Sequence, residues 1–214
     1  MVRLDACGRP VVGPRSVLTS KGFVSVSASA DNEEGEEFLV KNACGEPCIN
    51  EKDCSFLKRF NLTINFCKID PAGVELTTGQ RLVMDAAGDG VGFGMGEEIM
   101  CDGGFSLELW QKLTNADCDA GGNPEWYYWS WPFITSGQLG DVTFENGPFQ
   151  FSINAFTKKI ATDDQWGTDN RGPFCVYAAG QGLVVGEHAA NAITDVQPPD
   201  DACGLTPYAE QICA

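Results

Sequence analysis

Ten cysteines are the residues whose type and spacing first suggest chemistry in this chain. Cys44, Cys48 and Cys54 lie close together in a polar stretch and are separated by three and then five residues. Thiolates at this spacing could ligate zinc, but structural zinc sites are usually built from C-x-x-C pairs. The sequence therefore favours disulfides or free thiols over a metal site for this cluster.

The redox state of these thiols depends on where the chain folds. Its first ten residues contain no apolar segment of the kind found in secretory signals. We therefore expect folding in a cytosol, where the thiols start reduced and form bridges only after the product leaves the cell. No apolar run reaches the ~20 residues that a helix needs to cross a bilayer.

The case for an enzyme is weak, because the chain has a single histidine, His188. A Ser-His-Asp or Cys-His arrangement would have to use it, yet its neighbours match no nucleophile or metal motif. The 30 acidic residues would hide any pair of glycosidase carboxylates. We predict a chain without catalytic activity, in which His188 has a surface or packing role.

Two further patterns resemble ligand-binding motifs, but each lacks residues that its motif requires. Residues 85–90 resemble a calcium loop, but an oxygen ligand is missing at the third position and Gly96 replaces the bidentate glutamate. The alternate glycines of residues 88–96 do not form a phosphate-binding G-x-G-x-x-G motif, because Phe93 stands where a glycine is required. These glycines fit either a strand with one bare face or a loop. The sequence predicts neither a metal nor a cofactor.

The chain is strongly acidic, with a net charge of -16 and a pI near 4.2. Neutralising phosphates needs lysine and arginine, so this composition excludes a protein that wraps nucleic acid. It favours either simple solubility or a surface that repels polyanions. The densest acidic run contains Glu33, Glu34, Glu36 and Glu37, which are candidates for such a surface.

Alternating side chains predict half-buried strands and a β-rich fold. Residues 23–30 alternate strictly, so Val24 and Val26 are expected on one face and Phe23 with the serines on the other. Residues 60–67 alternate equally cleanly, with their large apolar side chains on one face.

Capping and turn signals add one helix and one hairpin. A short helix is predicted over residues 71–78, with Asp70 as N-cap, Pro71 at the first helical position and Gly79 as a left-handed end. A helix of this length needs packing to persist. The Asn-Gly dipeptide at residues 146–147, between two alternating runs, is a strong hairpin signal.

We expect one mainly β domain over residues 20–195, with a β-sandwich and one flanking helix. Residues 1–19 are expected to form an extended N-terminal arm and residues 196–214 a C-terminal tail. Residues 31–58 are expected to form a long loop that contains one short strand at residues 38–41. Residues 42–58 of this loop are polar, charged and rich in cysteine. Long loops of this kind are usually functional or mobile.

Several short motifs follow one another in an order that is more informative than any of them alone. They are residues 60–67 running into Asp70-Pro71 and Leu76-Thr77-Thr78-Gly79, then Gly90-Val91-Gly92-Phe93 and Phe105-Ser106-Leu107-Glu108-Leu109-Trp110, then Trp129-Ser130-Trp131-Pro132-Phe133 through residues 140–149, and Trp166-Gly167 with Gly172-Pro173-Phe174. In this order the chain resembles the tail tube proteins, or major tail proteins, of siphoviruses, especially those infecting actinobacteria. The resemblance spans a little over half of the chain.

The resemblance implies a β-sandwich whose subunits form six-membered rings that stack into a hollow tube. A long β-hairpin loop and the terminal arms would bridge neighbouring rings. The tube would be part of the virion, assembled in the host cytoplasm, and would guide DNA into the host. Its other partners would be a tape measure protein, a tail terminator and baseplate proteins. Candidate residues for the assembly interface are Glu33, Glu34, Glu36, Glu37, Cys44, Cys48 and Cys54.

Other functions stay open at this point. A disulfide-stapled β-sandwich could bind carbohydrate through the aromatic run at residues 126–133, although aromatic side chains more often fill a core or a subunit interface. A tail terminator or a capsid decoration protein of similar fold would form a single ring or remain a monomer. A hydrolase built on carboxylates has only the number of acids in its favour.

Overall fold

A computed structural model describes residues 1–66, 70–97, 100–113, 126–140, 151–168, 176–177, 181–202 and 204–209. Within these ranges the fold is mainly β, with one short helix and antiparallel strand pairs. This confirms the predicted class of a β-sandwich-like, mainly β fold with a single flanking helix. The hairpin predicted at residues 146–147 lies outside the described residues.

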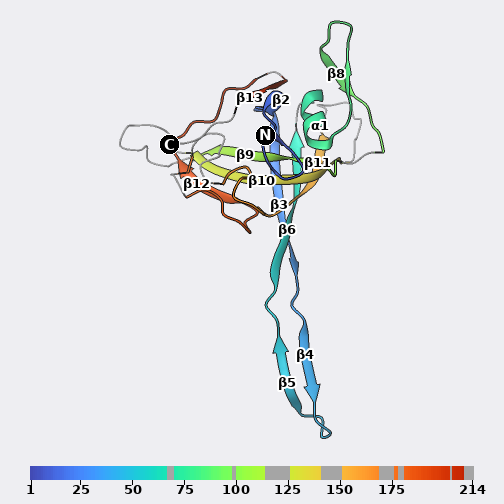
Figure 1. The fold of residues 1–214 in the computed structure, drawn as a ribbon, viewed down its shortest axis with the longest axis vertical. Helices are drawn as coiled ribbons and strands as arrows, with labels where there is room; N and C mark the ends of the chain where they lie inside the picture. The colour runs from blue at the N-terminus through green and yellow to red at the C-terminus, as the bar shows by residue number, and fades with distance from the viewer. Residues whose placement is uncertain are drawn as a thin grey trace.

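Nine strands form one large sheet (Figure 1). They are β1 (Val2–Leu4), β2 (Gly13–Leu18), β3 (Phe23–Glu33), β6 (Phe56–Phe66), β9 (Gly104–Lys112), β10 (Trp126–Leu139), β11 (Phe151–Thr157), β12 (Ala190–Thr194) and β13 (Leu205–Tyr208). The order is β13-β2-β1-β9-β10-β11-β6-β3, with β12 paired to β10 beside this path. Two small sheets stand apart, one of β4 (Glu37–Lys41) and β5 (Pro47–Lys52), the other of β7 (Leu82–Met84) and β8 (Gly90–Phe93).

Strand β10 is central because it pairs with β9 and β12 along its first half and with β11 along its second. Its register against β9 shifts between Trp131 and Ile134. Pro132 lies at this shift, where a residue without an N–H group does not interrupt a regular ladder. The pairing with β9 resumes beyond the shift, at Ile134 and Phe105.

The core forms where alternating side chains of the sheet meet the helix. Leu62, Ile64 and Phe66 on β6 are buried together with Phe105 and Leu107 on β9. Apolar burial at ~25 cal/mol per Å² makes this cluster the main stabilising term of the fold. The predicted alternation of β6 is confirmed.

Strand β3 follows a different pattern from the predicted one. Its register against β6 shifts by one residue next to Val24, a β-bulge that pairs Phe23 with Phe66 and Val26 with Ile64. Since paired residues share a face, Phe23 and Val26 lie on the same side, whereas the alternation had separated them. The prediction from strict alternation was wrong here, because one inserted residue moves the side chains that follow it to the opposite face of the strand.

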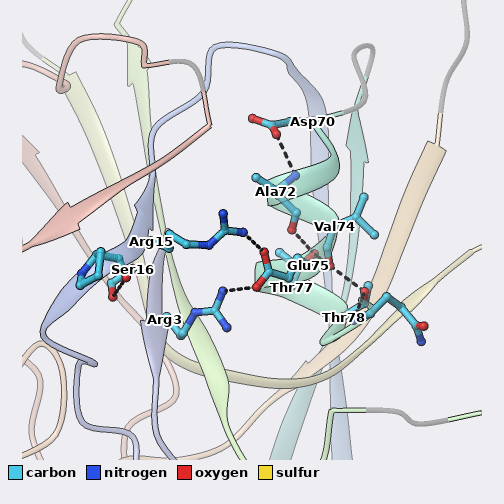
Figure 2. Close-up of polar contacts among 12 residues, drawn as sticks. Arg3, Arg15, Ser16, Asp70, Ala72, Val74, Glu75, Thr77 and Thr78 are labelled. Atoms are coloured by element: carbon cyan, nitrogen blue, oxygen red, sulfur yellow. Dashed lines mark hydrogen bonds and ion pairs between the residues drawn. The ribbon is translucent and has the colours of Figure 1, made fainter. Parts of the chain in front are cut away.

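Helix α1 (Pro71–Thr78) has the predicted bounds and caps. The Asp70 carboxylate accepts from the N–H of Ala72 at 3.0 Å, and Gly79 ends the helix at φ 74°. The hydroxyl of Thr78 donates to the carbonyl of Val74 at 2.6 Å (Figure 2). Both ends of the helix are therefore specified locally, as the sequence predicts.

The N-terminal segment is part of the sheet, so its prediction as an extended arm differs from the structure. Val2 and Leu4 are buried in the core, and β1 and β2 both belong to the large sheet. Figure 2 shows Arg3 and Arg15, from these two strands, both contacting Glu75 of α1, at 3.2 and 2.5 Å. Two cations on one partly buried carboxylate tie the segment to the helix.

The C-terminal tail is likewise tied to the body. Strand β13 pairs with β2, and Tyr208 packs edge-on against buried Trp166, with the ring centroids 5.4 Å apart. Glycine and proline content predicted a free segment, but short edge strands also carry these residues. The residues beyond 209 lie outside the described part.

Three tight turns share one sequence pattern, Asp or Asn followed by Ala, any residue and Gly. In each, the side-chain oxygen of the first residue accepts from the N–H groups two and four positions later. The fourth residue is a glycine in the left-handed region: Gly8 (φ 80°), Gly45 (φ 83°) and Gly88 (φ 89°). The turns begin at Asp5, Asn42 and Asp85. The calcium-like stretch is thus a hairpin turn that uses its own carboxylate.

We expect Asp70→Ala to lower the free energy of unfolding by about 1 kcal/mol, because it removes the N-cap of α1. Urea denaturation should show a lower midpoint with an unchanged slope. Glu34→Ala, which removes an exposed acid, is the control and should have little effect. An unchanged midpoint for Asp70→Ala would contradict the assignment of the cap.

Candidate assembly surfaces

A long β-hairpin leaves the body of the protein and extends far beyond it (Figure 1). Strand β11 accompanies β6 only as far as Asn61. From there the ladder of β3 and β6 continues alone to Glu33 and Phe56, and β4 and β5 carry it to a turn at residues 42–46. The short strand predicted at residues 38–41 is confirmed as β4. The rest of residues 31–58, predicted as loop, is for the most part paired strand as well.

Side chains at the exit point fix the direction of the hairpin. Arg59 pairs with Asp31 at 2.8 Å and lies over the ring of Phe156, 4.8 Å from its centroid. The N–H of Phe60 donates to the hydroxyl of Thr157 at 2.9 Å. These contacts come from strands on both sides of the exit, so the hairpin is braced where it loses its third strand.

The single histidine belongs to this brace. The ring of His188 is buried, and its Nδ1 lies 2.9 Å from the hydroxyl of Thr157. Burial lowers the pKa of His188, and nearby Lys159 lowers it further. The ring also packs edge-on against Phe60, so the structure places His188 in a packing position.

One face of the hairpin tip is apolar and exposed. Register pairs Val40 with Ile49 and Phe38 with Glu51, so Phe38, Val40 and Ile49 share a face. These three side chains are 48%, 51% and 45% exposed. Among the described strands β4 and β5 pair only with each other. Such an isolated two-stranded ribbon has little stability of its own in water, and its exposed apolar face marks an interaction surface.

The predicted acidic cluster lies at the joint between the two parts of the hairpin. Glu33 pairs with Lys58 at 3.0 Å, Glu37 stands opposite Lys52, and Glu34 and Glu36 lie in the segment between β3 and β4. All four are exposed. Exposed pairs of this kind contribute at most about 1 kcal/mol, so the cluster shapes the local field more than it stabilises the hairpin.

Gly35 is a residue of this joint that the sequence did not single out. A methyl group on Gly35 would overlap the carbonyl oxygen of Asp53 on the returning chain. The N–H of Asp53 donates to the carbonyl of Glu36 at 2.9 Å, so the two backbones meet here. Only glycine lets the two backbones come this close without moving either of them. In the sequence, a glycine between acidic residues predicted only an exposed turn.

The three clustered cysteines lie on the hairpin. Cys44 is the third residue of the turn, Cys48 lies on β5, and Cys54 lies two residues after β5, beside the joint; all three are exposed and unbridged. Within the described part of the chain no three His, Cys, Asp or Glu side chains gather as metal ligands would. The tip therefore presents thiols to solvent, at the point farthest from the body.

The outer edge of β3 is a second candidate surface. Strand β3 is the last strand of the sheet path, runs for eleven residues and contains neither proline nor lysine. Monomeric proteins usually blunt such edges with those residues. The opposite edge, β13, has four residues and includes Pro207. The long edge is thus the one suited to pairing with another chain.

An apolar groove of about 300 Å³ opens beside the start of β3. Its wall includes Phe23 and Val26 from one end of the sheet path and Val17 and Leu18 from near the other end. The groove therefore lies at the seam between the two ends of the sheet path, where residues 19–21 cross from β2 to β3, and Leu109 and Trp126 of β9 and β10 complete its wall. This size and lining are typical of binding sites, and the sequence gives no signal for it because its residues come from distant segments.

A buried carboxyl, Glu108, lines the same groove. Burial raises the pKa of Glu108 to about 7, against opposing effects from the Met1 amino group, Trp166 and Ser106. The indole N–H of Trp166 donates to Glu108 at 2.9 Å. The carboxyl is held in place and is protonated in a large fraction of molecules near neutral pH.

The aromatic run at residues 126–133 is not an open platform. Tyr128, Trp131 and Phe133 are buried, and the other aromatic residues of the run are half-buried. Trp129 stacks on Trp131 with ring centroids 5.4 Å apart. The run thus contributes chiefly to packing, as expected from the burial of large rings. No helix among the described residues is long and apolar enough to span a membrane.

Stability should depend on pH through Glu108. Its raised pKa gives stability that is fully present below pH ~4.5 and is lost as the pH rises through about 7. Glu108→Gln keeps an acceptor for Trp166 and removes the titration. The quantity to measure is the free energy of unfolding of the variant minus that of the wild type. This difference should rise by at most about 3 kcal/mol from pH 5 to pH 8, because only the wild type loses stability as Glu108 ionises. A constant difference across this range, matching that of the exposed control Glu34→Gln, would contradict this account.

Comparison with known proteins identifies no relative of this chain. No family model matches it, and neither the curated proteins nor the solved structures contain a significant match. A functional proposal therefore rests on the chain's own residues and on the geometry of the hairpin, the β3 edge and the groove.

Proposed function

We propose that this chain is a structural subunit that polymerises, as stacked rings, into a hollow tube of the siphovirus tail tube type. The observation that carries the proposal is the hairpin with its exposed face of Phe38, Val40 and Ile49. A segment this long, attached to a well-packed body and apolar on one side, is costly for a monomer. It is suited to crossing from one subunit to the next.

Two different surfaces support a polymer better than a dimer. The long edge of β3 offers unpaired backbone groups for a lateral contact, and the hairpin offers an apolar contact along its own direction. Contacts between unlike surfaces that close give rings, and those that repeat along an axis give filaments or tubes. The number of six subunits in each ring comes from the family resemblance alone.

The charge of the chain fits a conduit for DNA. A net charge of -16 per subunit would be multiplied in a tube, and an acidic lumen repels phosphate in place of binding it. We propose that DNA passes through without specific contacts. A tape measure protein, a tail terminator and baseplate proteins are the partners that this role requires.

The carbohydrate-binding alternative has lost its main support, because residues 126–133 are mostly packed inside. A single-ring virion protein, such as a tail terminator, would use the β3 edge but would have no need for a hairpin that reaches beyond the ring. An open polymer is the property that separates the two.

Negative-stain electron microscopy of the purified protein at rising concentration should show hollow tubes of uniform width with a regular axial repeat. Salt should favour their growth, because it screens repulsion between acidic subunits. Reductant should shorten or weaken the tubes if thiols such as Cys44 form bridges after assembly. Particles that stay monomeric under every condition would contradict the proposal.

Replacing residues 34–54 by an Asn-Gly turn should leave the body folded and abolish tube formation. The removed residues pack on nothing else in the described chain, and Asn-Gly can close the remaining β3–β6 ladder. Circular dichroism would confirm the fold and microscopy would count the tubes. Tubes of normal length from this variant would rule out a role for the hairpin, and loss of the fold would show that the hairpin stabilises the body.

A further inference from the structure

We propose that the groove at the seam of the sheet is the receptor for the hairpin tip of a second copy of this chain. In this contact the face of Phe38, Val40 and Ile49 covers the groove beside Phe23 and Val26. The inference deepens the proposed function and rests on it, because it names the surface that receives the hairpin.

The hairpin does not fill its own groove. Its strands β4 and β5 have no partner strands other than each other among the described residues, and the tip lies far below the body in the view of Figure 1. The same chain therefore carries an apolar hairpin face and an apolar groove that do not meet within one copy. When the hairpin of one copy enters the groove of a second, the groove of the first and the hairpin of the second remain free for further copies.

The groove offers backbone as well as side-chain contacts. Phe23 and Val26 in its wall belong to β3, whose outer edge has no strand partner in the described part of the chain. An extended segment laid along that edge could add a strand to the sheet while its alternate side chains enter the groove. The face of Phe38 and Val40 has the required spacing of two residues.

Charge sets the orientation of the contact. Lys21 lies exposed at the groove, and Glu51 shares the face of Phe38 because the two are paired across the hairpin. Glu108 also lines the groove, and its raised pKa favours its neutral form, so an apolar tip does not meet a full buried charge there. Lys21 and Glu51 carry complementary charges, whereas the two chains as a whole repel each other.

Two sets of variants test the hairpin face and the groove separately. Phe38→Asp with Ile49→Asp disables the hairpin face, and Thr19→Trp or Phe23→Asp, two independent changes, disables the groove. Leu39→Asp is the matched control, since Leu39 is 49% exposed and points to the opposite face of the same strand. Circular dichroism and thermal melting would verify that each variant is folded.

We expect each disabled variant to raise the critical concentration for assembly by about 10-fold or more, because each loses apolar burial at the contact. The Leu39→Asp control should assemble at the wild-type concentration. Mixing the hairpin variant with a groove variant should then give mixed complexes and no tubes, detected as co-elution of the two variants in size exclusion. Each partner has one intact surface, so the hairpin contact can form once between them and cannot be repeated along the axis.

Groove variants that form tubes as readily as wild type would overturn this inference and leave the tube proposal standing. Two variants that do not co-elute when mixed would also overturn it. Mixed complexes of the two variants, together with a wild-type protein that forms no tubes, would support the contact and count against the tube. A wild-type protein that is monomeric at all concentrations, with an apolar small molecule retained in native mass spectrometry, would overturn both.

Discussion

The pairing of β3 with β6 is the interaction on which the rest of the structure depends. The same ladder begins in the core, where Ile64 and Leu62 are buried, and continues past the last residue that β11 can reach. Inside the body it is stabilised by apolar burial, and outside by hydrogen bonds and by the brace of Arg59 and Asp31. Because one pair of strands does both, the direction of the hairpin is fixed by the packing of the body.

The body of the protein has a packed core, whereas the hairpin has none. The body buries its core side chains, pairs β1, β2 and β13 into the sheet and packs His188 inside, although apolar side chains at its β3 edge, such as Val24, stay exposed. The hairpin leaves Phe38, Val40 and Ile49 in water. A polymer resolves this imbalance, and the strong negative charge then becomes a property of a shared surface.

Features specified within a few residues could be predicted from the sequence, and features specified by distant pairing could not. The helix was predictable because Asp70, Pro71 and Gly79 define both of its ends locally. The bulge at Val24 was not, since a single inserted residue is set by the partner strand. The first strand of the hairpin tip was predictable from the apolar residues 38–41, but its partner β5 was predicted as loop because it is short and mostly polar. The turn between them, which repeats the pattern that begins at Asp5, was the signal that could have revealed β5.

Hydrogen–deuterium exchange, compared between dilute monomer and assembled protein, would show whether the hairpin contacts a second subunit. We expect the amides of β4 and β5 to exchange rapidly in the monomer, where the ribbon is unsupported. In the assembly they should be strongly protected, together with those of β3 at the open edge. Hairpin amides that exchange equally fast in both states would show that the tip contacts nothing in the polymer, and would contradict the account.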